Sequence, residues 1–208
     1  MLRLIRARYT TALALAITGF MTLYAAAAMA DSDGKGIDLY TRFFIRTPDR
    51  AAIRQIEQLL IHRQYKSAEL LIKLETVPQA VWLSGGSPKE VAQLVQKTLL
   101  QAEFQRAMPV FVPYNVPGRD CGGYSAGGAQ TTPDYKAWID AIAAAIRQRD
   151  AIVILEPDAI ANLPADCGYD PTGQLTADRY TQLNYAVGAL QALPRTRVYL
   201  DAAHSHWQ

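Results

Sequence analysis

The stretch Ala151-Ile152-Val153-Ile154-Leu155 is an uninterrupted apolar run, and Glu156-Pro157-Asp158 follows it directly. A short continuous run of this kind is typical of a strand that is buried on both faces of a parallel sheet. In such sheets the chemistry gathers beyond the carboxyl ends of the strands. The two carboxylates that follow Leu155 therefore mark the place where we expect a functional site.

Shorter apolar runs and long helical patterns alternate on both sides of this stretch. Further strands are expected over residues 80–83, 109–114 and 197–200, and helices over residues 50–62, 67–73, 87–106, 133–149 and 176–193. Ser87 is expected to cap its helix, with Pro88 at the first helical position. Asp49 or Thr47 is the expected cap of the first helix. Strands that alternate with long helices predict an α/β fold with a parallel sheet.

The composition is that of an ordinary globular chain. The sequence has 208 residues and a formal net charge of +2, which is too small to indicate a nucleic-acid partner. No Gly-x-Gly-x-x-Gly follows the first strand and no phosphate-binding loop is present, which argues against a dinucleotide-binding fold. Residues 31–49 are polar and are expected to form a loose lead-in to a domain over residues 50–208.

Residues 1–30 have the features of a secretory signal peptide. Three arginines precede an apolar stretch over residues 11–28, and Ala28-Met29-Ala30 fits the small-x-small cleavage pattern. An uncleaved membrane anchor is the alternative, because the apolar stretch approaches the length that spans a bilayer. The polar residues 31–34 carry no positive charge, and this favours cleavage. We therefore expect a secreted protein with no membrane contact after cleavage.

Polar and aromatic side chains follow the expected strands. They are Trp82 at the end of the first strand, Asn115, Arg119 and Asp120 after the second, Glu156 and Asp158 after the third, and Asp201, His204, His206 and Trp207 after the fourth. Because the carboxyl ends of parallel strands meet at one edge of a sheet, these residues are expected to lie close together. Periodicity alone predicts a site made from Trp82, the loop after Tyr114, Asp158 and the C-terminal tail.

Three ordered motifs within these segments resemble those of a known family. Residues 114–128 read YNVPGRDCGGYSAGG, residues 155–162 read LEPDAIAN and residues 199–207 read YLDAAHSHW. They resemble signatures of glycoside hydrolase family 6, whose members are endoglucanases and cellobiohydrolases. The resemblance extends from about Val77 to the last residue. It implies a distorted, TIM-like (β/α) barrel and hydrolysis of β-1,4-glucosidic bonds in cellulose or related β-glucans, with inversion and without a metal or organic cofactor.

The resemblance also implies catalytic roles for three residues. Asp158 matches the general acid, and Asp120 matches the aspartate that raises the pKa of this acid and assists in handling water. Tyr114 matches the tyrosine that distorts the bound sugar. This chemistry needs an acid that keeps its proton near neutral pH, and a second carboxylate nearby has that effect through like-charge repulsion.

Four further residues match positions that contact substrate. Trp82 matches an aromatic sugar platform, and His204 and Trp207 match contacts beyond the cleavage point. Ser125 matches a residue of the mobile loop that, in the family, closes over the site and helps to position water. Trp82 and Trp207 each offer a flat apolar face against which a pyranose ring can stack. The implied partner is a β-glucan polysaccharide.

The sequence contains two cysteines, Cys121 and Cys167. An even number in an exported chain favours a disulfide, and two free thiols are the alternative. Neither cysteine has a second cysteine or a histidine at ligand spacing, so no metal site is expected. The resemblance implies a disulfide that ties the Asp120 loop to the segment after Asp158.

Several of these residues also have simpler structural interpretations. Asp158 follows a proline and is of a type that caps a helix starting at Ala159. Trp82 fits a core position at the end of a strand. Arg119 would lower the pKa of Asp120 if the two side chains paired.

The sequence ends shortly after the fourth expected strand. A complete (β/α) barrel typically needs about 250 residues, so we expect the N-terminal part of an incomplete barrel. Two classes of function follow from this. The first is a glucanase that needs a complementary C-terminal fragment on a second chain, which would supply the general base. The second is an inactive or glucan-binding truncated fragment.

Overall fold

The computed structural model describes residues 41–203. The chain divides into two compact units between Gln79 and Ala80. The signal peptide expected over residues 1–30 lies outside the described residues, as do His204 and Trp207. The single domain expected over residues 50–208 stays a prediction.

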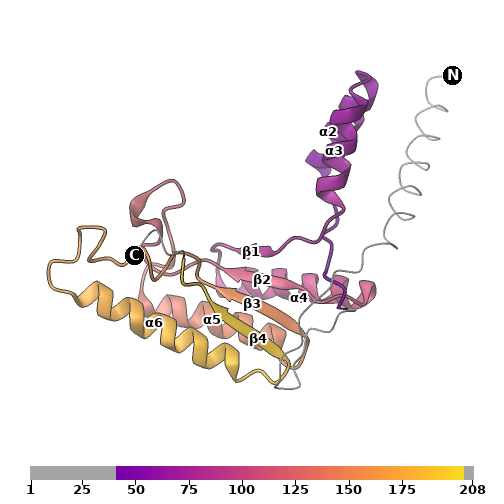
Figure 1. Ribbon diagram of the computed structural model, residues 1–208. Coiled ribbons are helices and arrows are strands. Elements are labelled where there is room, and N and C mark those ends of the chain that lie inside the picture. Colours follow the sequence, from indigo (N-terminus) through magenta and orange to yellow (C-terminus); the bar gives the residue numbers. More distant parts are fainter. Residues whose placement is uncertain (1–40, 204–208) are drawn as a thin grey trace. The chain divides into compact units, whose positions relative to one another are not determined.

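The first unit contains a pair of helices, α2 (Arg50–Ile61) and α3 (Tyr65–Glu75), which pack on each other (Figure 1). Asp49 caps α2, because its Oδ1 accepts hydrogen bonds from the N–H groups of Ala51 at 2.7 Å and Ala52 at 2.8 Å. Helix α3 extends two residues further in each direction than the helix predicted over residues 67–73, so that prediction is too short.

The second unit contains a four-stranded parallel sheet. Its strands are β1 (Val81–Leu83), β2 (Val110–Pro113), β3 (Ala151–Leu155) and β4 (Thr196–Leu200), and they lie in the order β1-β2-β3-β4. The α/β fold and the parallel sheet predicted from the sequence are confirmed. In β3, Val153 and Leu155 on one face are fully buried, whereas on the other face Ile152 is 6 % exposed and Ile154 is half-buried.

Three helices connect these strands: α4 (Pro88–Gln105), α5 (Thr132–Ile146) and α6 (Gln174–Gln191). Ser87 and Glu90 form a reciprocal capping box at the start of α4, with Pro88 inside it as predicted. Helix α4 packs on α5, and α5 packs on α6 along one face of the sheet (Figure 1). Sequential strand order with right-handed crossovers places successive helices on the same face, unlike the two-sided dinucleotide fold.

The core of this unit lies between the sheet and these helices. Its most deeply buried side chains include Phe111, Val153, Trp138, Ile139 and Ile142, all at most 2 % exposed. Helix α5 ends earlier than the predicted residue 149, because Arg147 adopts a positive φ of 54° that an α-helix does not allow. Within residues 41–203, no helix is long and apolar enough to cross a membrane.

Candidate active site

Three backbone hydrogen bonds continue the sheet one residue beyond its strands. They run from the N–H groups of Tyr114, Glu156 and Asp201 to the carbonyls of Leu83, Pro113 and Leu155 respectively, at 2.9, 2.9 and 3.1 Å. Tyr114, Glu156 and Asp201 are therefore held at the same level of the sheet by the backbone alone. This edge is the one that the sequence predicted for the site.

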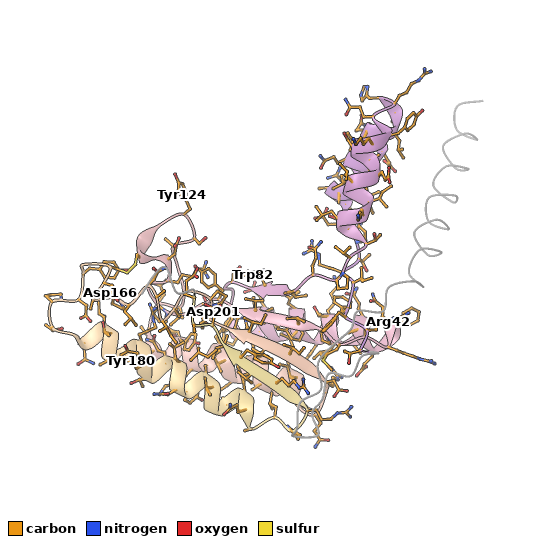
Figure 2. All side chains as sticks on the ribbon, in the orientation of Figure 1. Arg42, Trp82, Tyr124, Asp166, Tyr180 and Asp201 are labelled. Carbon is orange, nitrogen blue, oxygen red and sulfur yellow. A yellow bond between two sulfur atoms is a disulfide. The ribbon has the colours of Figure 1, made fainter. Side chains whose placement is uncertain are left out.

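Trp82 and Tyr114 form the aromatic part of this edge. Their rings meet edge to face, with centroids 5.7 Å apart and an interplanar angle of 88°. Trp82 is 55 % exposed and is therefore not a core residue, whereas Tyr114 is 8 % exposed. Figure 2 shows Trp82 and Asp201 near the ends of β1 and β4. The exposed indole leaves a flat apolar face available beside the site.

Arg119 points toward backbone carbonyls and toward the ring of Tyr114. Its Nε donates to the carbonyl of Ser125 at 2.7 Å, its Nη1 donates to the carbonyls of Ser84 and Tyr114, and its guanidinium carbon lies 4.6 Å from the centre of the Tyr114 ring. Among the described residues, no ion pair joins Arg119 to Asp120. The two neighbours therefore do not form the pair that the sequence left open.

Hydrogen bonds from the residues that follow Asp120 in its loop hold both its side chain and its carbonyl. It adopts a positive φ of 59°, and its Oδ2 accepts a hydrogen bond from the N–H of Ser125 at 2.6 Å. Its carbonyl accepts a second bond from the N–H of Gly123, also at 2.6 Å. Ser125 is exposed and contributes its backbone to this arrangement. The carboxylate of Asp120 therefore has a defined direction at the base of the loop.

Asp158 is fixed by its own backbone and by Asp201. Its φ is 65°, its N–H donates to Oδ1 of Asp201 at 3.0 Å, and its carbonyl accepts from the N–H of Asn162 at 2.8 Å. The same Oδ1 of Asp201 accepts from the N–H of Ala203 at 2.9 Å. In the described part of the chain the next helix after Asp158 is α6, so Asp158 caps no helix at Ala159.

The electrostatic environment of Tyr114 links the two aspartates. Burial raises the pKa of the Tyr114 hydroxyl, and the negative charges of Asp120 and then Asp158 raise it further. Both carboxylates therefore act on the same phenol. The structure brings together the three side chains that the sequence singled out as catalytic, although they come from two different loops.

Glu156 is a buried carboxyl group to which the sequence analysis gave no role beyond its place after a strand. It is 0 % exposed and accepts hydrogen bonds from the N–H groups of Asn115 at 2.9 Å and Val116 at 3.0 Å. Burial raises its pKa from 4.5 to about 7, although these two hydrogen bonds act in the opposite direction. In the sequence, the only indication of a role for Glu156 was its position directly after an entirely apolar strand.

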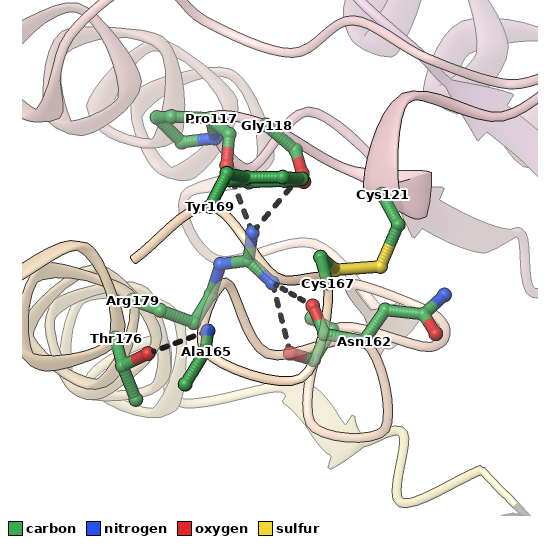
Figure 3. Close-up of a disulfide and its surroundings, with 10 residues drawn as sticks. Pro117, Gly118, Cys121, Asn162, Ala165, Cys167, Tyr169, Thr176 and Arg179 are labelled. Carbon is green, nitrogen blue, oxygen red and sulfur yellow. Dashed lines mark hydrogen bonds between the residues drawn. A yellow bond between two sulfur atoms is a disulfide. The ribbon is translucent and has the colours of Figure 1, made fainter. Parts of the chain in front are cut away.

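Cys121 and Cys167 form a disulfide, with their Cα atoms 5.3 Å apart (Figure 3). The predicted bridge is confirmed, and the alternative of two free thiols is excluded. The bridge joins the loop of Asp120 to the segment that follows Asp158. Among residues 41–203, no group of three or more His, Cys, Asp or Glu side chains could hold a metal ion.

This combination of fold and motifs agrees with a comparison against protein families. The model of the family described as glycosyl hydrolases family 6 matches residues 39–208. The chain belongs to this family. The resemblance drawn from the three sequence motifs is therefore confirmed.

Family 6 relatives include several named as endoglucanases. Endoglucanase 1 from Streptomyces sp. (strain KSM-9) is 37 % identical over 137 residues, which are 65 % of this chain and 37 % of that protein. Endoglucanase A from Cellulomonas fimi is 40 % identical over 139 residues, which are 66 % of this chain and 29 % of that protein.

A solved family 6 structure matches the fold. It is an endoglucanase from Mycobacterium tuberculosis in complex with a methyl-cellobiosyl thio-cellobioside, with a TM-score of 0.66 and 34 % sequence identity. The match covers 81 % of this chain and 54 % of the Mycobacterium chain. This chain therefore spans about half of that enzyme and a smaller part of the two curated relatives.

Proposed function

We propose that this chain acts in the hydrolysis of β-1,4-glucosidic bonds of cellulose or related β-glucans, with Asp158 as general acid and Asp120 assisting. The observation that carries the proposal is that Asp120 and Asp158 lie on loops that leave the same carboxyl edge of the sheet, where Asp158 donates its N–H to Asp201 and the charges of both carboxylates act on the Tyr114 hydroxyl. Membership of glycosyl hydrolases family 6 and the oligosaccharide complex of the Mycobacterium endoglucanase support the substrate class.

The proposed reaction proceeds with inversion. Asp158 donates its proton to the leaving oxygen as the glycosidic bond breaks, while water attacks the anomeric carbon from the opposite face and loses its proton to a general base that the complementary C-terminal fragment would supply. The negative charge of Asp120 favours the protonated form of Asp158 before the reaction. Tyr114, packed against Trp82 and under Arg119, distorts the sugar ring at the cleavage point. Positioned proton transfer of this kind contributes about 10²–10⁴-fold to the rate.

Substrate binding is assigned to Trp82, Ser125, His204 and Trp207. The exposure of the Trp82 indole supports its role as a sugar platform. Ser125 lies on the loop that starts at Asp120, which supports a role in closing that loop over a bound glucan. His204 and Trp207 follow Asp201 along the chain, and their assignment rests on the sequence motif alone.

We also propose that the sheet is the N-terminal part of a distorted (β/α) barrel. Four parallel strands in sequential order, with helices packed successively on one face, support this arrangement. The protein is proposed to be secreted after cleavage of residues 1–30, and the disulfide supports an oxidising destination. The alternatives are a glucan-binding fragment without activity and a cellulase that needs a complementary chain.

The decisive substitution is Asp158→Asn, which keeps the size of the side chain and removes the acid. We expect hydrolysis of carboxymethylcellulose, measured as reducing sugar released, to fall by about 10²–10⁴-fold, while glucan binding is retained. The chain is assayed alone and mixed with the part of a family 6 relative that it does not cover. Asp166→Asn, an exposed aspartate on the same segment, is the matched control.

The outcomes separate the alternatives. Full activity of Asp158→Asn would contradict the assignment of the general acid. Release of sugar only in the mixed assay would support the need for a complementary chain. No release in either assay, with glucan binding intact, would contradict hydrolysis and favour the binding fragment.

A further inference from the structure

Arg179 is a buried arginine behind the two catalytic loops. It lies in the first half of α6, and it is 1 % exposed although its side chain is one of the largest and most polar in the protein. None of the three sequence motifs includes it. A fully buried guanidinium is costly unless its donors find acceptors, so the position of those acceptors indicates what the residue does.

The acceptors belong to both catalytic loops. Nη1 of Arg179 donates to the carbonyls of Ala159 at 2.9 Å and Asn162 at 3.2 Å, on the segment that starts at Asp158. Nη2 donates to the carbonyl of Pro117 at 2.8 Å and approaches that of Gly118 at 3.5 Å, on the segment that leads to Asp120. Figure 3 shows the guanidinium between these two segments, beside the disulfide.

The chemistry of arginine suits this bridge. Its planar fork presents donors in fixed directions and keeps its charge when buried, whereas lysine offers one compact ammonium group on a flexible stem. Charged donors also make stronger hydrogen bonds to carbonyl oxygens than neutral donors do. Burial lowers the pKa of the Arg179 guanidinium, and the charge that Glu156 carries when ionised acts in the opposite direction.

We propose that Arg179 is a positioning residue that sets the separation of Asp120 and Asp158 by holding both of their loops on one guanidinium. The proposal rests on the function assigned above to these two aspartates. It adds a constraint that differs from the disulfide. The disulfide joins the loops at Cys121 and Cys167, whereas Arg179 holds the backbone at Ala159, directly after the acid.

The test is Arg179→Lys, which keeps the charge and removes the fork. We expect kcat for carboxymethylcellulose to fall by about tenfold to a hundredfold with little change in KM, because misplacement of catalytic groups by about 1 Å costs rate on this scale. The pH dependence of kcat/KM is expected to change as well, since the placement of Asp120 relative to Asp158 decides how strongly the two carboxyl groups interact. The activity is measured in whichever assay, alone or mixed, shows hydrolysis.

Arg195→Lys is the matched control, because Arg195 is exposed and its guanidinium pairs with Asp150 on the surface. We expect Arg195→Lys to leave kcat and the pH profile unchanged. Wild-type kcat and pH profile in Arg179→Lys would overturn the proposal. A rise in KM alone would also overturn it, because that result would assign Arg179 to binding.

A readout without activity keeps this inference separate from the proposed function. In Arg179→Lys, amide hydrogen exchange is expected to accelerate in both residues 116–122 and residues 158–163, while α4 and α5 stay protected. Acceleration in one segment only, or in neither, would overturn the bridge. If the wild-type chain hydrolyses no glucan but both segments loosen, the function assigned to the aspartates fails and the bridge stands.

A measurement on the unsubstituted protein covers the case in which Arg179→Lys does not fold. The Nη protons of Arg179, observed by nuclear magnetic resonance, should exchange with water more slowly than those of Arg195 by at least about a hundredfold, because Arg179 is 1 % exposed and its Nη atoms donate to backbone carbonyls of two segments. Equal exchange at the two arginines would contradict the bridge directly.

Discussion

At the scale of single residues, Glu156 couples the site to pH. Its carboxyl group is fully buried, accepts the N–H groups of Asn115 and Val116, and has a pKa raised to about 7 by burial. In the unfolded chain the same group would have its ordinary pKa of 4.5. The folded state therefore binds a proton that the unfolded state has lost between these two values.

This difference predicts how stability changes with pH. The contribution of Glu156 is fully present below the unfolded pKa and is lost as pH rises through the folded pKa near 7. Between pH 4.5 and 7 the loss amounts to about 3–4 kcal/mol of unfolding free energy, at about 1.4 kcal/mol per pKa unit. In Glu156→Gln this part of the pH dependence should disappear. Urea denaturation at several pH values, followed by tryptophan fluorescence, measures it.

Glu103→Gln is the control, since Glu103 is exposed and pairs with Arg149 at the surface. Its stability profile should follow that of the wild type. If Glu156→Gln retains the wild-type pH dependence, the buried carboxyl is not the group that titrates.

The sequence pointed to those candidate site residues that fall in an ordered motif. It did not point to a residue whose partners are backbone carbonyls. Asp120, Asp158 and Tyr114 lie in such motifs, and in the structure the charges of the two aspartates both raise the pKa of the Tyr114 hydroxyl. Arg179 could not be predicted, because its acceptors are carbonyls 17 to 62 residues away and carbonyls carry no sequence signal. Their positions follow only from the packing of α6 on its neighbours.

At the scale of elements, two backbone hydrogen bonds join the two ends of the loop between Tyr114 and α5. We call this closed base of the loop its neck. The N–H of Arg119 donates to the carbonyl of Gly127 at 3.3 Å, and the N–H of Ala129 donates to the carbonyl of Asn115 at 2.9 Å. Gly128 lies between these bonds with a φ of +102°, and a Cβ there would come within 2.1 Å of the carbonyl oxygen of Val116. The neck therefore requires glycine at this position.

Gly128→Ala should open the neck, because both the positive φ and the contact with Val116 oppose a side chain. We expect a loss of about 2–3 kcal/mol in unfolding free energy and faster amide exchange over residues 119–127. Gly118→Ala is the comparison, since its φ is +64° and no atom lies within 4 Å of the added Cβ. It should cost about 1 kcal/mol. Equal losses in the two variants would show that the contact with Val116 does not matter.

The elements were predicted where hydrophobic periodicity and capping residues coincide, as at Ser87 and Asp49. Their ends were missed where the capping is not readable. Helix α3 starts after Gln64, whose side chain makes no capping bond. Helix α6 starts after Gly173, and the N–H groups of Leu175 and Thr176 in its first turn donate to the carboxylate of Asp170, several residues earlier. Local sequence contains no rule for such distant caps.

At the scale of the whole molecule, the disulfide depends on the compartment in which the chain folds. Cys121 and Cys167 enclose a segment with a sequence separation of 46, so the bridge removes much of the freedom of the unfolded chain. Oxidising compartments maintain such bonds, and the cytosol does not. The proposed signal peptide over residues 1–30 would decide whether the chain reaches an oxidising compartment and forms the disulfide. It would therefore also affect the free energy of unfolding.

A chain expressed with residues 1–30 in a secreting host should appear outside the cell, start at Asp31 and contain no free thiol. The same chain without residues 1–30 should keep both thiols and lose about 2–4 kcal/mol of unfolding free energy. N-terminal sequencing, thiol titration and urea denaturation measure these three quantities. An exported product that still starts at Met1 would favour the membrane anchor. Equal stability of the oxidised and reduced forms would contradict the role of the disulfide.

The backbone bonds that extend the sheet to Tyr114, Glu156 and Asp201 also matter for how such a protein can evolve. They fix the residue at which each loop leaves the sheet, independently of the length of the loop that follows. Mutation can therefore lengthen or shorten these loops without displacing their first residues. A single sheet edge can in this way carry loops of very different length, because each doubling of a flexible loop costs only about 0.6 kcal/mol in closure entropy.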